Sequence, residues 1–269
     1  MSAKPEERVL LGIRRPLVGV VHLAPLPGSP RYAGSVQEVL DVARRDAEAL
    51  VAGGMDGLLV ENFGDAPFLA QAAGPEVPAA VAVVLRELRP LCRGPLGVNV
   101  LRNDARSAIA AAAAAGADFV RVNVHTHAAV TDQGIVEGMA GETLRYRAAL
   151  RCEVRILADV AVKHAVPLVA IPLEQLARET AGRGLADALI VTGPSTGEPP
   201  LPEELRRVRG AVAVPVLVGS GLTPANAADL LPLADGAIVG SALRRGGLAG
   251  SPVEPERVAR LVEAARAAL

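Results

Sequence analysis

The sequence predicts an α/β protein: a single-domain (β/α)8 barrel, also called a TIM barrel. Three observations support this fold class. Strand-like apolar runs alternate eight times with helix-like segments. The length of 269 residues suits one such barrel. The last two apolar runs each end in a Gly/Ser turn. An open doubly wound sheet is the alternative, but it usually places its glycine-rich turn after the first strand, where this chain has a Pro-rich segment following His22.

The expected strands are short runs of Val, Leu, Ile and Ala. Aromatic residues make up only 2% of the chain, so these branched and small residues must fill the barrel interior. The eight strands are expected at Leu17–His22, Gly57–Asn62, Leu96–Leu101, Phe119–Val124, Val154–Asp159, Ala188–Thr192, Val216–Ser220 and Ala237–Ser241.

Between the strands, apolar residues recur near the helical period of 3.6. The helices are expected at Val36–Ala52, Glu76–Leu91, Asp104–Ala115, Glu142–Arg151, Leu173–Arg183, Pro202–Val212, Pro224–Leu231 and Pro255–Ala268. Ser35, followed three residues later by Glu38, predicts a capping box, and Gly116 predicts a helix end. No interior linker divides the chain, so we expect one domain over residues 1–269, with residues 1–15 as an N-terminal extension.

Charge and composition exclude several function classes. A net charge of −1 provides no overall field for nucleic acid. Cys92 and Cys152 lack metal-ligand spacing and do not suggest a disulfide framework. The chain has no signal-peptide pattern and no apolar run long enough to span a membrane. We therefore expect a cytoplasmic protein with no nucleic-acid partner and no transmembrane segment. The sequence leaves open whether the protein forms a homo-oligomer.

The two Gly/Ser turns, Gly219-Ser220-Gly221 and Gly240-Ser241, predict a phosphate site. Glycines let a backbone approach an anion, serines offer hydroxyls, and Thr223-Pro224 can begin a helix whose first N–H groups bind the ligand. In parallel α/β barrels a phosphate site often follows the last two strands. Two tight strand-to-helix turns without a ligand are the alternative. The expected phosphate-binding residues are Gly219, Ser220, Gly221, Gly240 and Ser241.

Side-chain alternation in the strands places polar residues inside the barrel. Val120 and Val122 share one face of the fourth strand, and Arg121 and Asn123 share the other. Because helices cover the outside of a barrel, the valines face outward and the polar residues face inward. The same parity predicts a polar set at the barrel mouth: Glu61, Asn99, Arg121, Asn123, His125 and Asp159. A salt bridge from Arg121 to Glu61 or Asp159 that only fills the barrel is the alternative.

Further residues could contact a substrate. His22 ends the first strand and could bind a ligand or the backbone of its own loop. Lys163 lies on a loop, so we expect a phosphate or carboxylate partner rather than a Schiff-base lysine; an outward, solvated lysine is the alternative. No cofactor is required, although Glu61, Asp159 and His125 are candidate ligands for a divalent metal. The segment Thr192–Gly197 could close over a ligand as a lid or be a simple turn.

Six sequence motifs are spread along the chain: Gly19-Val-Val-His22-Leu-Ala-Pro-Leu-Pro-Gly-Ser-Pro30, Glu61-Asn-Phe-Gly-Asp-Ala-Pro67, Gly97-Val-Asn99, Arg121-Val-Asn123, Ala158-Asp-Val-Ala-Val-Lys-His164 and Leu217-Val-Gly-Ser-Gly221. In these motifs the sequence resembles the BtpA family, and the similarity covers nearly the whole chain. The resemblance implies a barrel of the ribulose-phosphate-binding type. Some members of the family are named photosystem I biogenesis proteins, and relatives called SgcQ belong with carbohydrate-utilisation genes.

Together these features predict a protein that binds a small phosphorylated, sugar-like metabolite and isomerises, epimerises or cleaves it. Asp159 or Glu61 would move a proton, while Arg121, Asn99 and Asn123 would stabilise negative charge on oxygen. The expected substrate contacts are His22, His125 and Lys163. The alternatives are a regulatory barrel that only binds a phosphorylated ligand, and a non-catalytic photosystem I assembly factor, which could associate peripherally with a membrane.

Overall fold

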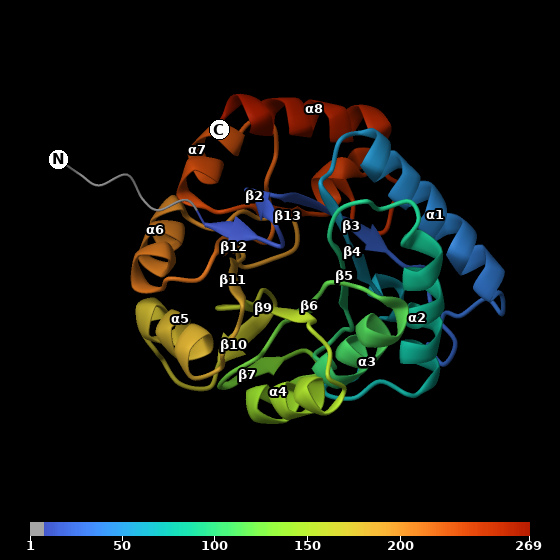
Figure 1. Cartoon of the computed structure of the whole chain (residues 1–269), viewed down its shortest axis with the longest axis horizontal. Coiled ribbons are helices and arrows are strands. Elements are labelled where there is room, and N and C mark those ends of the chain that lie inside the picture. Colours follow the sequence, from blue (N-terminus) through green and yellow to red (C-terminus); the bar gives the residue numbers. More distant parts are fainter. Residues whose placement is uncertain (1–7) are drawn as a thin grey trace.

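A computed structural model describes residues 8–269 and confirms the predicted fold class. Eight parallel strands close into a barrel in the order β11-β12-β13-β3-β4-β5-β6-β9, and the helices form a ring around it (Figure 1). The barrel strands are β3 Leu17–His22, β4 Gly57–Glu61, β5 Leu96–Asn99, β6 Phe119–Val122, β9 Arg155–Asp159, β11 Ala188–Val191, β12 Val216–Val218 and β13 Ala237–Val239.

The outer helices follow the predicted periodicity closely. They are α1 Val36–Ala52, α2 Glu76–Leu88, α3 Ala105–Ala115, α4 Ala140–Ala149, α5 Leu173–Gly182, α6 Pro202–Ala211, α7 Ala227–Leu230 and α8 Pro255–Ala267. Ser35 accepts a hydrogen bond from the N–H of Glu38, as expected for an N-cap. No helix between residues 8 and 269 has the length and apolar character needed to cross a membrane.

Most barrel strands are shorter than predicted, and one helix is much shorter. β12 and β13 have three residues each, because the Gly/Ser turns begin directly after them. Helix α7 begins at Ala227 rather than Pro224, because the Asn226 side chain accepts the N–H of Thr223 at 2.8 Å. The expectation that Thr223-Pro224 begins a helix is therefore wrong, and five residues separate Gly221 from the start of α7.

Alternation along the strands separates two apolar layers. Val120 and Val122 belong to the layer between barrel and helices, as the parity argument requires. Inside the barrel, Gly97 lies beside Phe119: a Cβ on Gly97 would meet the phenyl ring at 2.2 Å. The inner layer consists of Leu10, Val18, Val20, Leu59, Phe119, Leu157, Ala188, Ile190, Leu217 and Ile238.

Two small sheets were not predicted. Strands β1 Val9–Leu10 and β2 Ile13–Arg14 form an antiparallel pair, whose Leu10 packs into the inner layer. A three-stranded sheet joins the loops that follow β6 and β9. Its hairpin, β7 Ala128–Thr131 and β8 Gly134–Glu137, comes from the first loop, and β10 Ala165–Pro167 comes from the second.

Candidate active site

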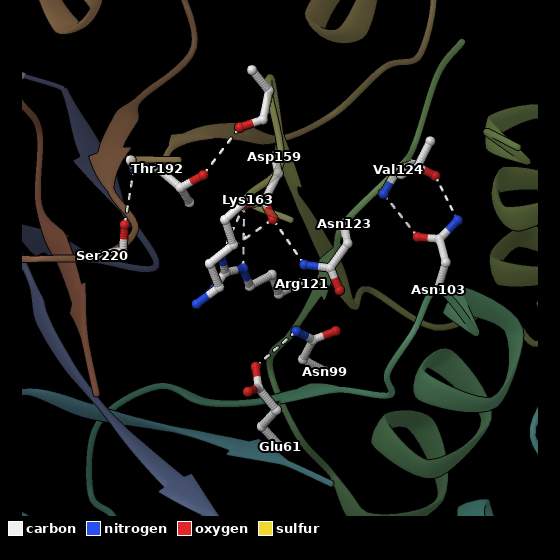
Figure 2. Close-up of polar contacts among 12 residues, drawn as sticks. Glu61, Asn99, Asn103, Arg121, Asn123, Val124, Asp159, Lys163, Thr192 and Ser220 are labelled. Carbon is white, nitrogen blue, oxygen red and sulfur yellow. Dashed lines mark hydrogen bonds and ion pairs between the residues drawn. The ribbon is translucent and has the colours of Figure 1, made fainter. Parts of the chain in front are cut away.

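The polar residues of the barrel interior lie at the carboxyl ends of neighbouring strands. Glu61 ends β4, Asn99 ends β5, and Asp159 ends β9, while Arg121 lies in β6 and Asn123 follows it. Figure 2 shows their side chains converging on the centre of the barrel mouth. All five residues are buried. In the structure these five side chains therefore face inward, as strand parity predicts.

Arg121 and Asp159 form a buried ion pair. Arg121 donates from Nε to Asp159 Oδ1 at 3.2 Å and from Nη2 to Oδ2 at 3.1 Å. Asn123 Nδ2 donates to the same Oδ2 at 2.8 Å. The side chains are 3% and 0% exposed, so Asp159 has little room to reach a substrate. The neighbouring carboxylates also raise the pKa of Arg121 against the effect of its burial.

Glu61 is the more accessible carboxylate of the mouth. Its side chain is 10% exposed. Asn99 Nδ2 donates to Glu61 Oε2 at 2.9 Å, which fixes one oxygen, while Oε1 lies 3.9 Å from His22 Nε2. A carboxylate with one anchored oxygen and one oxygen facing the mouth is positioned to accept a proton from a ligand.

Two neighbours orient His22, and its surroundings favour the neutral ring. Its Nδ1 accepts the N–H of Gly250 at 3.2 Å, and its ring stacks on Phe63 with centroids 4.4 Å apart. Burial, together with the charges of Arg244 and Lys163, lowers the pKa of His22 well below its usual value. Because Nδ1 is an acceptor, the proton of the neutral ring resides on Nε2, which lies on the side of Glu61.

Lys163 reaches the mouth although it lies on the loop after β9. Figure 2 shows its side chain beside Arg121, in the centre of the polar set. Its backbone oxygen accepts from Arg102 Nη2 at 2.7 Å, which holds the loop in place. Burial first, and then the positive charge of Arg121, lower the pKa of Lys163, while Glu61 and Asp159 raise it. Lys163 therefore does not point outward into solvent, which was the alternative to a ligand-binding lysine.

His125 does not lie with the other polar residues. Its Nε2 pairs with the Gly184 oxygen at 2.8 Å, just beyond the end of α5, and the charges that influence its pKa are Arg147 and Asp187. The expectation that His125 faces the barrel interior is wrong, because β6 ends at Val122 and the strand parity does not extend that far. The set of Glu61, Asp159 and His125 is therefore not assembled as a metal site. Within residues 8–269 no group of three or more His, Cys, Asp or Glu side chains is placed to hold a metal ion.

The two Gly/Ser turns lie against one loop, residues 193–199. A Cβ on Gly197 would come within 3.2 Å of Ser241 Oγ. Gly221 has a φ of +68°, and a Cβ there would meet Pro199 N at 2.1 Å. The N–H groups of Gly221, Ser241 and Ala242 have no acceptor among the described residues. Unpaired N–H groups at adjacent turns can bind an anion.

Two of the expected phosphate contacts are already engaged by protein groups. The Gly219 N–H donates to the Val191 oxygen at 2.8 Å, within the barrel sheet. Ser220 Oγ accepts the N–H of Gly193 at 3.0 Å and donates to the Glu198 oxygen at 2.8 Å. Ser220 therefore fastens the loop of residues 193–199 to the end of β12 and does not offer a free hydroxyl to a ligand. A separate cavity of about 400 Å³ lies between the loops after β6 and β9, and Asn123 and Asp159 are among its lining residues.

Sequence reasoning missed two arginines next to the site. Arg102 supports Lys163, and its Nε has no partner among the described residues. Arg244, 1% exposed, donates to Asp46 Oδ2 and to the Val20 oxygen, both at 2.8 Å. Asp46 lies 198 residues away in sequence, so no local pattern could reveal this pair.

Comparisons with known proteins agree with this architecture. The model of the BtpA family matches residues 13–267. The photosystem I biogenesis protein BtpA of Synechocystis is 47% identical over 250 residues, covering 93% of this chain and 87% of that protein. An uncharacterised protein of Archaeoglobus fulgidus is 46% identical over 254 residues, covering 94% of this chain and 100% of that protein.

Among solved structures, a thiamine phosphate pyrophosphorylase from Pyrococcus furiosus superimposes with a TM-score of 0.58. The alignment covers 95% of this chain and 96% of that protein, at 17% sequence identity. At this level of identity the similarity concerns the fold.

Proposed function

Because the chain belongs to the BtpA family and its barrel gathers charged side chains beside two glycine turns, we propose that it binds a small phosphorylated, sugar-like metabolite. We further propose that it isomerises, epimerises or cleaves this metabolite. The observation that carries the proposal is the set of unpaired N–H groups at Gly221, Ser241 and Ala242, next to a mouth that contains Glu61.

The phosphate would lie between the two turns, under the loop of residues 193–199. Backbone N–H groups bind phosphate oxygens without adding a titratable charge. The presence of glycine at position 221 lets the loop approach closely, since a Cβ there would clash with the Pro199 nitrogen at 2.1 Å. The solved barrel from Pyrococcus furiosus is itself named for a phosphorylated compound, which agrees with this assignment.

Proton transfer at the carbon skeleton would fall to Glu61. Its anchored Oε2 fixes the direction of Oε1, so the carboxylate can remove a proton next to a carbonyl group. Arg121, Asn99 and Asn123 would stabilise negative charge on the substrate oxygen, and Asn123 Oδ1 has no partner among the described residues. Asp159 would hold Arg121 in place rather than contact the substrate. These proton transfers call for no redox cofactor.

The phosphate site can be tested with inorganic phosphate and melting temperature. A ligand that binds only the folded state stabilises it by mass action, so phosphate should raise the melting temperature of the wild type. Ser241→Asp should abolish that rise, because a carboxylate at the turn repels the anion. Ser107→Asp, on the first turn of α3, is the matched control for the added charge and should keep the rise. An undiminished rise in Ser241→Asp would refute the site.

The catalytic part can be tested with Glu61→Gln. Sugar phosphates that stabilise the wild type are first identified by thermal shift and then tested for turnover. The variant should keep the thermal shift and lose turnover, because the glutamine preserves the shape and removes the proton acceptor. Full turnover by Glu61→Gln would remove Glu61 from the mechanism.

A second candidate function follows from the name of the Synechocystis relative, which is a role in photosystem I biogenesis. It would need the surface of the barrel rather than its mouth. A Synechocystis strain that lacks its own relative can be complemented with this chain or with the Glu61→Gln variant. Equal recovery of photosystem I by both would favour the assembly role, while recovery by the wild type alone would favour catalysis.

A further inference from the structure

Lys163 is one of only two lysines in a chain with 28 basic residues, and the other, Lys4, lies outside the described residues. Arginine otherwise supplies the side-chain cations of this protein, in buried ion pairs such as Arg121–Asp159 and in exposed ones such as Arg207–Glu174. A guanidinium binds phosphates and carboxylates well, but it stays protonated. A lysine amine can lose its proton and act as a nucleophile. The lysine at the barrel mouth therefore supplies a group that no arginine can supply, an amine able to lose its proton.

The loop that carries Lys163 is held from two sides. Arg102 Nη2 donates to the Lys163 oxygen at 2.7 Å, and the next residue, His164, donates its N–H to the Pro194 oxygen at 3.2 Å. The His164 ring also pairs with Thr196 Oγ1 at 2.9 Å. These contacts connect the loop to the loop after β5, which carries Arg102, and to the loop after β11, which carries Pro194 and Thr196. Figure 2 shows the Lys163 side chain extending from this fixed backbone into the polar set. An amine on a fixed backbone meets a substrate carbonyl in few orientations.

Burial and the neighbouring arginines favour the neutral form of the amine. Burial has the largest effect and lowers the pKa of Lys163, and the positive charges of Arg121 and Arg102 lower it further. Glu61 and Asp159 act in the opposite direction, but Asp159 is itself paired with Arg121. A larger share of the amine is therefore unprotonated near neutral pH than for a solvated lysine. Only the unprotonated amine can attack a carbonyl carbon.

We propose that Lys163 is a nucleophile that forms an imine with the carbonyl group of an open-chain aldose or ketose phosphate. This inference rests on the proposed function for the phosphate group of the ligand. In the first step the Nζ lone pair forms a C–N bond, and the carbonyl π electrons move to oxygen, which takes over one proton from Nζ. The resulting neutral carbinolamine takes up one proton from solvent at its hydroxyl group, loses water and leaves a protonated imine.

Glu61 would then complete the reaction. Its carboxylate removes a proton from the carbon next to the imine, and the electron pair of that C–H bond moves into the C=N⁺ group to form an enamine. Return of a proton to the carbon restores the imine, and hydrolysis by one water releases the product and the free amine. For cleavage, Glu61 instead removes the proton of a hydroxyl group on the second carbon from the imine. That oxygen becomes the carbonyl of the departing fragment, and the electron pair of the bond between the first and second carbons moves toward the nitrogen to form the enamine. The scheme covers epimerisation next to the imine and C–C cleavage without an external oxidant or reductant, but not isomerisation, since moving the carbonyl to the neighbouring carbon would leave Lys163 bound as an amine.

Reduction with sodium borohydride traps the imine as a stable secondary amine. The probes are dihydroxyacetone phosphate, a ketose phosphate, and glyceraldehyde phosphate, an aldose phosphate, each beside its unphosphorylated counterpart. Mass spectrometry of the intact protein and of its peptides locates the adduct. Because the chain has two lysines, Lys4→Arg serves as the control that leaves only Lys163, and Lys163→Arg keeps the positive charge but cannot form an imine.

We expect an adduct at Lys163 in the wild type and in Lys4→Arg, and only background labelling in Lys163→Arg. The phosphate-induced rise in melting temperature, measured on the same samples, shows whether each variant is folded and binds the anion. Absence of the adduct in the wild type with both phosphorylated probes would overturn the proposal, as would equal labelling of Lys163→Arg. Equal trapping of phosphorylated and unphosphorylated probes at Lys163 would instead support the imine and contradict the phosphate site.

Discussion

The ion pair between Arg121 and Asp159 allows a quantitative prediction. Asp159→Asn keeps the size of the side chain but removes the negative charge that faces a guanidinium whose side chain is 3% exposed. Leaving one partner of a buried pair uncompensated typically costs about 3–5 kcal/mol of folding free energy. At about 2–4 °C per kcal/mol for a chain near this size, the melting temperature should fall by roughly 6–20 °C.

The measurement is chemical denaturation of the wild type, Asp159→Asn, Arg121→Gln and the double variant. The double variant should be less destabilised than the sum of the single variants, because it contains no unpaired charge. The matched control is Glu174→Gln, which breaks the exposed pair with Arg207 at 2.6 and 2.8 Å and should change stability far less. A loss below about 1 kcal/mol in Asp159→Asn would refute the reasoning, since breaking a buried pair costs more.

Three further predictions concern loop, packing and pH. Ser220→Ala should speed hydrogen exchange in the loop after β11, because the hydroxyl joins two backbone groups of that loop, and it should leave phosphate stabilisation intact. Gly97→Ala should cost roughly 1–3 kcal/mol by overpacking against Phe119, whereas Gly210→Ala on α6, with open space around it, should be neutral or stabilising in urea denaturation. The folded-state pKa of His22 lies below the unfolded value of 6.5, so its contribution to stability is present above about pH 6.5 and is lost as pH falls below it. In the same assay, His22→Gln should therefore show a shallower loss of stability over that range.

Much of the fold follows from local patterns. The helix α1 was predicted to the residue, because Ser35 and the apolar period mark its start and its buried face. The hairpin of β7 and β8 was missed, since its strands have four residues each and too little alternation to mark them. The helix expected at Pro224 failed because the Asn226 side chain, rather than a helical turn, satisfies the N–H of Thr223.

The polar residues of the site also fall into two groups: those whose direction the local sequence pattern predicted and those whose direction it did not. Glu61 and Arg121 lie within regular strands, and parity placed them correctly. His125 lies beyond the end of β6, where alternation no longer holds. The direction of Lys163 depends on its contact with Arg102, 61 residues away, and no local pattern contains it. Sequence periodicity predicts side-chain direction inside regular elements, while direction in loops depends on distant contacts.

The small sheet of β7, β8 and β10 has a consequence for how the mouth opens. Its central strand β7 pairs with β8 from its own loop and with β10 from the next βα loop, at Thr131–Ala165, Val130–Val166 and Ala129–Pro167. Neither loop can therefore swing out alone without giving up this pairing. Opening of this side of the barrel therefore requires the two loops to move together or the strand pairs to break. The loops after β6 and β9 thus form one structural unit at the barrel mouth.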